Sequence, residues 1–168
     1  QRSEAFWHDN RDPASVPAGI DQLQHYSRES VVRRSAAEGY FPHWNAYEFS
    51  GFPLQPDLQA GVFYPPSVAL RSLPLPSFLT WTVIFHVWLF GIGGYAFCRV
   101  WGIGRVAAAL AGIALMLGGI IFPRVYAGHM DVLRTAAWIP LALALGVRSI
   151  DHGSRLPSPL LVLVLGCQ

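Results

Sequence analysis

Two long uncharged stretches constrain this chain more than any other feature. Residues 80–98 and 106–122 contain no Asp, Glu, Lys or Arg, whereas charged residues recur throughout the first 71 positions. A helix needs roughly 17–25 apolar residues to cross a hydrocarbon layer of about 30 Å. The sequence therefore predicts an all-α membrane protein, in which a bundle of transmembrane helices follows a structured extracytoplasmic loop with short juxtamembrane helices.

The composition agrees with a membrane protein and argues against a nucleic-acid binder. Only 13% of the residues are charged, about half of the 25% that globular domains carry. All twelve basic residues are Arg, and those of the second half stand singly between apolar runs instead of clustering on a polar face. Cys98 and Cys167 lie in or beside apolar runs, so neither a zinc site nor a disulfide framework is indicated.

The apolar runs divide residues 77–168 into four expected spans. They cover about 78–97, 106–122, 133–147 and 159–168, and the sequence ends within the last one. The third reaches only about 22 Å at 1.5 Å per residue, so it must extend back through residues 126–134 or begin below the membrane surface. In the second, Ala108 and Gly112 are four residues apart, the spacing that lets helices approach closely in lipid.

Residues 1–76 form the expected outer loop. Residues 26–38 predict a short helix that Gly39 ends, and the many prolines of residues 40–66 exclude a long regular element there. The chain has no initiator Met or signal-peptide pattern and ends in an apolar run. We therefore expect a piece of a longer protein, whose remaining transmembrane helices would be partners of this segment along with the lipid bilayer.

The arginines of the short loops predict the orientation. Four of them follow the first and third spans, at Arg99, Arg105, Arg148 and Arg155. The excess of basic residues in cytoplasmic loops places that side in the cytoplasm. The predicted location is the cytoplasmic (inner) membrane, with residues 1–76 and the turn at residues 124–134 on the outer side.

Two groups of motifs resemble bacterial membrane proteins of the YfhO type, which are multi-pass proteins related to the GT-C glycosyltransferases. The first follows the family's order Trp-Asn, aromatic-Gly-x-Pro, Asp and Gln, then Phe-Tyr-Pro, here at Trp44, Asn45, Tyr47, Phe49, Gly51, Pro53, Asp57, Gln59, Gly61, Phe63, Tyr64 and Pro65. The second is similar to the family's Arg, Gly-His and Trp-x-Pro pattern, at Arg124, Gly128, His129, Trp138 and Pro140. The resemblance covers roughly residues 20–145.

The resemblance implies transfer of a sugar from a polyprenyl-phosphate donor to a cell-envelope acceptor. GT-C enzymes use an acid in the first outer loop, which Asp21 matches; Gln24 and Tyr26, which follow it, would bind the substrate. Asp21 would act as the general base, or would position a divalent cation that does the same work; no other cofactor is indicated. The spacing from Asp21 to Tyr26 is one residue shorter than the family pattern, and Ser27 replaces the usual Pro. The alternative role for Asp21 is capping a helix.

The remaining candidate residues would bind the substrate, and each has a structural alternative. Arg124, His129 and Arg134 would hold the carrier phosphate, or only mark the end of a span among lipid headgroups. The loop candidates are Trp44, Asn45, Asp57 and Gln59. The alternative for Asp57 and Gln59 is to stabilise a turn. Trp44, Tyr47 and Tyr64 would stack on a sugar ring, and their alternative is to anchor the loop at the membrane interface.

Two other classes of function compete with the transferase. A transporter would use His86, near the middle of the first span, and the pair His129 and Asp131 as coupling groups. The alternative for His86 is a neutral imidazole bonded to a carbonyl one turn away. A non-catalytic membrane scaffold of the same fold is the third possibility, and the shortened spacing after Asp21 favours it.

Overall fold

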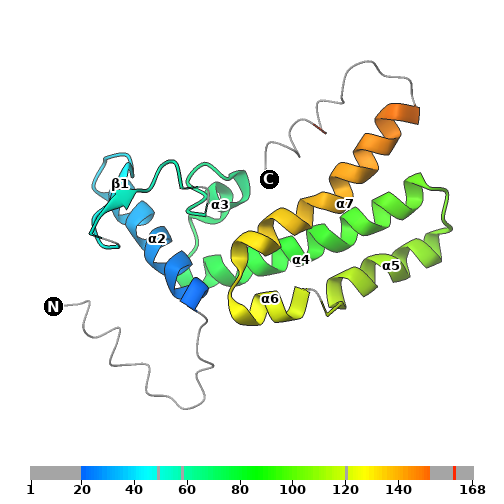
Figure 1. Cartoon of the computed structure of the whole chain (residues 1–168), viewed down its shortest axis with the longest axis horizontal. Coiled ribbons are helices and arrows are strands. Elements are labelled where there is room, and N and C mark those ends of the chain that lie inside the picture. Colours follow the sequence, from blue (N-terminus) through cyan, green and yellow to red (C-terminus); the bar gives the residue numbers. More distant parts are fainter. Residues whose placement is uncertain (1–19, 49, 58, 120, 152–160, 162–168) are drawn as a thin grey trace, which may run out of the picture.

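The computed structural model describes residues 20–48, 50–57, 59–119, 121–151 and 161, without the side chains of residues 20–23 and 151. Most of the fourth expected span and the first part of the outer loop therefore lie outside the described residues. The elements in chain order are α2 (Ile20–Ala37), β1 (Trp44–Asn45), β2 (Phe52–Pro53), α3 (Pro65–Leu70), α4 (Leu75–Val100), α5 (Arg105–Leu117), α6 (Ile121–Ala127) and α7 (Met130–Asp151). Figure 1 shows α4, α5 and α7 side by side, with α2, β1 and α3 grouped at one end.

The chain is mostly helical, as the sequence predicts. Among the described residues, three helical segments are long and apolar enough to cross a membrane: Leu75–Val100, Arg105–Ala127 and Met130–Ile150. The second segment is divided into two helices, α5 and α6. Helix α5 ends at Leu117, where Gly118 takes an extended conformation. The prediction of apolar helices of transmembrane length is confirmed by length and composition.

The third apolar helix extends into a polar segment. The sequence places its apolar part at residues 133–147, whereas α7 begins at Met130 and includes Asp131 in its first turn. Its 22 residues correspond to about 33 Å, enough to cross the hydrocarbon layer. Gly128, at a φ of 82°, makes the turn between α6 and α7, in a conformation that favours glycine.

Glycines set the distance between α4 and its two neighbours. A Cβ atom added to Gly112 of α5 would lie 2.7 Å from the carbonyl oxygen of Gly91 in α4. One added to Gly93 would lie 2.9 Å from the backbone nitrogen of Leu141 in α7. Ala108 and Gly112 are both buried, so the small-residue spacing noted in the sequence lies on the face of α5 that packs against α4.

The segment before α4 has a small apolar core of its own. Helix α2 ends as predicted at Gly39, where the Gly39 N–H bonds the Ala36 carbonyl at 3.2 Å and the Tyr40 N–H bonds that of Ser35 at 3.0 Å. These two bonds form the Schellman pattern that closes many helices. The core beneath the loop consists of Val31, Val32, Leu54, Ala60 and Val62, with Phe52 packed against it.

The loop after α2 turns through a short hairpin. Strands β1 and β2 pair antiparallel, with Trp44 opposite Pro53 and Asn45 opposite Phe52. Gly51 has a φ of 105°, and a Cβ there would lie 2.7 Å from the indole nitrogen of Trp44. Glycine is therefore required at this turn both for its backbone conformation and for the space that Trp44 occupies.

Candidate functional site

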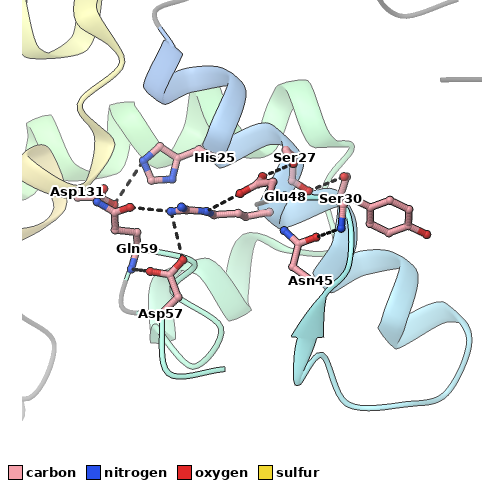
Figure 2. Close-up of polar contacts among 10 residues, drawn as sticks. His25, Ser27, Ser30, Asn45, Glu48, Asp57, Gln59 and Asp131 are labelled. Carbon is pink, nitrogen blue, oxygen red and sulfur yellow. Dashed lines mark hydrogen bonds and ion pairs between the residues drawn. The ribbon is translucent and has the colours of Figure 1, made fainter. Parts of the chain in front are cut away.

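Arg28 of α2 holds the hairpin loop through its charge. Its side chain is buried, and Nη1 donates to Gln59 Oε1 at 2.7 Å and lies 3.2 Å from Asp57 Oδ2. Its Nε donates to Glu48 Oε2 at 3.4 Å. The Asp57 Oδ1 atom also accepts the backbone N–H of Gln59 at 3.0 Å. Figure 2 shows Glu48, Asp57 and Gln59 converging from the loop. A buried guanidinium needs such compensation for its lost hydration.

Glu29, the next residue of α2, holds the segment that leads into α4. Its carboxylate is buried and accepts from Arg71 Nε at 2.9 Å and from Arg33 Nε at 3.0 Å. Arg71 also donates to the Val62 carbonyl at 3.2 Å. Because Arg28 and Glu29 are neighbours, one turn of α2 fixes both the hairpin loop and the start of the first apolar helix.

The same face of α2 meets the beginning of α7. His25 is buried, and its Nε2 atom lies 3.3 Å from Asp131 Oδ1; Figure 2 shows the two side chains facing each other. Arg134, one turn further along α7, donates to the Gln59 carbonyl at 3.4 Å and lies over the ring of Tyr64 at 5.7 Å. We call His25, Arg28, Asp57, Gln59, Asp131 and Arg134 the junction cluster.

Arg124 and His129 meet at the turn that precedes α7. Arg124 Nη1 lies 3.1 Å from His129 Nδ1. A guanidinium only donates hydrogen bonds, so His129 Nδ1 is the acceptor and the neutral ring carries its proton on Nε2. The Arg124 side chain is exposed. This turn therefore brings a guanidinium and an imidazole together, two groups that can bind a phosphate.

A partly buried hydrogen-bond chain links the loop to the interior of the helix bundle. The Trp138 Nε1–H of α7 donates to the Tyr64 hydroxyl at 2.7 Å, which lies 2.6 Å from His86 Nε2 of α4. His86 Nδ1 lies 2.6 Å from the Thr82 carbonyl, so Nδ1 carries the proton and Nε2 accepts from Tyr64. The expected bond from His86 to a carbonyl one turn away is present, and the partner on its other nitrogen comes from the loop.

The structure brings several of the predicted site residues together. Asp57 and Gln59 join Arg134 within the junction cluster, and Arg124 contacts His129 beside it. Trp44 is 57% exposed on the hairpin, away from these contacts. Asn45 is fully buried, and its Oδ1 accepts the Tyr47 N–H at 2.9 Å, a bond that shapes the hairpin turn.

The remaining predicted site residues lie on α2. Asp21 belongs to its first turn, although its side chain lies outside the described part of the chain. Gln24 and Tyr26 are half-buried on the next turn. His25, between them, contacts Asp131. The backbone of Asp21 is therefore one helical turn from the contact between α2 and α7.

Sequence reasoning missed the polar residues that organise this region. His25, Arg28 and Glu29 are buried with Val32 on one face of α2, at spacings of three, four and seven residues, which place side chains on one side of a helix. That periodicity was available in the sequence, but its charged members suggest a solvated face. Apart from Arg33, which pairs with Glu29 one turn away, their partners lie at least 20 residues away along the chain, so local patterns did not reveal them.

The described side chains provide no evident metal centre. Within that part of the chain, no three His, Cys, Asp or Glu residues are grouped so that they could hold a metal ion. No protein-family model, curated protein or solved structure matches this chain.

Proposed function

We propose that this chain belongs to a membrane glycosyltransferase of the YfhO and GT-C type, which transfers a sugar from a polyprenyl-phosphate donor to a cell-envelope acceptor. The motifs of the loop and of the turn before α7 support the family. The contact between His25 and Asp131 supports the site, because it joins α2 to the start of α7 at 3.3 Å. An acid one turn before His25 and the basic turn at residues 124–129 would then share one end of the helix bundle.

In this proposal Asp21 takes the proton from the acceptor hydroxyl as that oxygen bonds the sugar carbon. The bond from this carbon to the donor phosphate breaks, and its electron pair leaves with the polyprenyl phosphate. Arg124 and His129 would stabilise the departing phosphate by donating hydrogen bonds. Arg134, the third residue predicted to hold this phosphate, also positions the loop in this proposal, because its guanidinium contacts the Gln59 carbonyl and the Tyr64 ring.

The proposed compartment is the outer side of the cytoplasmic membrane. Arg99 and Arg148 lie in the last turns of α4 and α7, and Arg105 begins α5. An excess of arginine at these short connections supports a cytoplasmic position for them. The junction cluster, at the opposite end of α4 and α7, would then face outwards with the loop.

Sugar transfer by the full-length protein in lipid nanodiscs tests this proposal. The assay would supply polyprenyl-phosphate donors that carry different radiolabelled sugars, with a cell-envelope extract as acceptor. Loss of a general base costs about 100-fold to 10,000-fold in rate, so we expect Asp21→Asn to lose at least 100-fold. Glu38→Gln is the matched control, because Glu38 pairs with Arg34 at the exposed end of the same helix and should retain the full rate.

The outcomes separate the function from the residue that performs it. If the wild-type protein transfers no sugar from any of these donors, the transferase proposal fails. If Asp21→Asn transfers at the wild-type rate, the activity stands but Asp21 is not its base.

A non-catalytic scaffold is the second candidate. The pairing of Arg28 with Glu48, Asp57 and Gln59 favours it. These polar groups stabilise the loop structure by contacting one another instead of a substrate. Such a protein would retain the fold of the loop and show no transfer with any donor.

A further inference from the structure

An open groove lies between α4 and α7 at the end of the bundle away from the junction cluster. Its volume is about 540 Å³, and it is lined by Tyr95, Ala96, Arg99 and Val100 of α4 and by Leu141, Ala144, Leu145 and Arg148 of α7. The α7 residues are spaced by three, four and seven positions, so they form one stripe on that helix. Ala144 is buried, and its small side chain leaves room between the helices.

The groove combines apolar walls with two cations. Arg99 and Arg148 are exposed and lie at the same end of it, in the last turns of their helices. Arg99 Nη1 donates to the Ile103 carbonyl at 2.7 Å, a bond that stabilises the connection after α4. Among the described side chains, no carboxylate forms an ion pair with either arginine, and the pairs present involve α2, the loop and the first turn of α7.

We propose that this groove binds an anionic phospholipid. The lipid phosphate would lie between Arg99 and Arg148, and one acyl chain would follow Leu141, Ala144 and Leu145. Arg148 lies seven positions after Leu141, which corresponds to about 10.5 Å along the helix axis, a length that suits an acyl chain running from a headgroup towards the bilayer centre. Basic pockets between transmembrane helices recognise lipid phosphates in this way.

The charge of the groove distinguishes this occupant from a further apolar helix. An apolar helix packed against these walls would offer no anion to the two guanidinium groups, which no carboxylate among the described side chains neutralises. An anionic headgroup neutralises them at the level where the apolar walls end. This inference does not depend on sugar transfer, because the groove lies at the other end of α4 and α7 from Asp21.

Native mass spectrometry of the full-length protein with added phosphatidylglycerol or phosphatidylcholine of identical chains tests the proposal. We expect one tightly retained phosphatidylglycerol and no equivalent phosphatidylcholine. Each arginine near a lipid surface contributes about fivefold in affinity, so Arg99→Gln with Arg148→Gln should weaken retention by about 25-fold. Arg105→Gln is the matched control, because Arg105 lies at the same end but does not line the groove.

Several results would overturn the lipid site. Equal weakening by Arg105→Gln would show attraction by bulk charge, and equal retention of phosphatidylcholine would show that the phosphate charge is not recognised. An Ala96→Cys variant, with Cys98, Cys167 and any other native cysteine of the full-length protein replaced by Ser, would be treated with a lipid-soluble maleimide after delipidation. Labelling that added phosphatidylglycerol blocks supports the proposal, whereas a thiol that never reacts indicates that another segment of the protein fills the groove.

Discussion

The variant Tyr64→Phe removes one oxygen atom and leaves two buried nitrogen atoms without their partner. His86 is fully buried and Trp138 is 8% exposed, so water cannot easily replace the lost hydroxyl at either of them. An orphaned buried polar atom costs about 1–3 kcal/mol, whereas hydrogen bonds between membrane helices average about 0.6 kcal/mol. The substitution leaves two nitrogen atoms, His86 Nε2 and Trp138 Nε1, in buried residues without this hydrogen-bond partner. We therefore expect Tyr64→Phe to lower the free energy of unfolding by about 2 kcal/mol.

Reversible unfolding in mixed detergent micelles, followed by circular dichroism, would measure this loss. Tyr126→Phe is the matched control, because Tyr126 is 63% exposed, and it should change the free energy of unfolding by less than about 0.5 kcal/mol. A double-mutant cycle with His86→Leu isolates the bond between Tyr64 and His86. We expect a coupling energy of about 1 kcal/mol for this contacting pair.

Additive effects of the two substitutions would refute the hydrogen-bond chain. So would a Tyr64→Phe variant as stable as Tyr126→Phe, since both changes remove the same atom from the same type of side chain. The nitrogen chemical shifts of His86 supply an independent check, because the chain requires the proton to be on Nδ1.

Three further predictions concern other parts of the chain. Arg28→Met should lower the free energy of unfolding by about 3 kcal/mol in the same assay, because two partly buried carboxylates lose their cation; a loss below 1 kcal/mol would contradict this. Gly112→Ala should cost about 1–3 kcal/mol because its Cβ would lie 2.7 Å from a carbonyl oxygen of α4, whereas Gly146→Ala, which meets open space, should gain up to about 1 kcal/mol. The hydrogen bond from Arg34 holds the pKa of Glu38 below its ordinary value. The ion pair therefore stabilises the fold at pH values above the unfolded-state pKa of Glu38, and this stabilisation is lost as the pH falls through the lower folded-state pKa. In Arg34→Gln, the pKa of Glu38 measured by carbon-13 titration should return to the ordinary range.

The apolar helices and the end of α2 follow from local sequence patterns. A run of apolar residues specifies a helix for lipid by length alone, and Gly39 ends α2 because its φ of 78° is accessible to glycine at little cost. The start of α7 was less evident. Asp131 and Arg134 interrupt the apolar pattern, yet they lie within the helix because His25 and Gln59 provide them with polar partners.

The candidate site could be predicted only in part. The loop motif indicated Asp57 and Gln59, and the polar boundary between the second and third spans indicated Arg134, which the structure brings together with them. They did not indicate Arg28, because a charged residue on a short polar helix usually faces water. Its burial depends on partners contributed by the loop, and a pattern confined to one helix contains no information about such distant contacts.

The bond between Tyr64 and His86 has a consequence for biosynthesis. Tyr64 is translated before His86, whereas Trp138 emerges only with the third apolar helix. When the first such helix leaves the translocon, the loop residue that satisfies its imidazole has therefore already been made. The first apolar helix can therefore satisfy His86 with the Tyr64 hydroxyl before later helices are inserted. Trp138 adds its hydrogen bond to Tyr64 once the third apolar helix has been made.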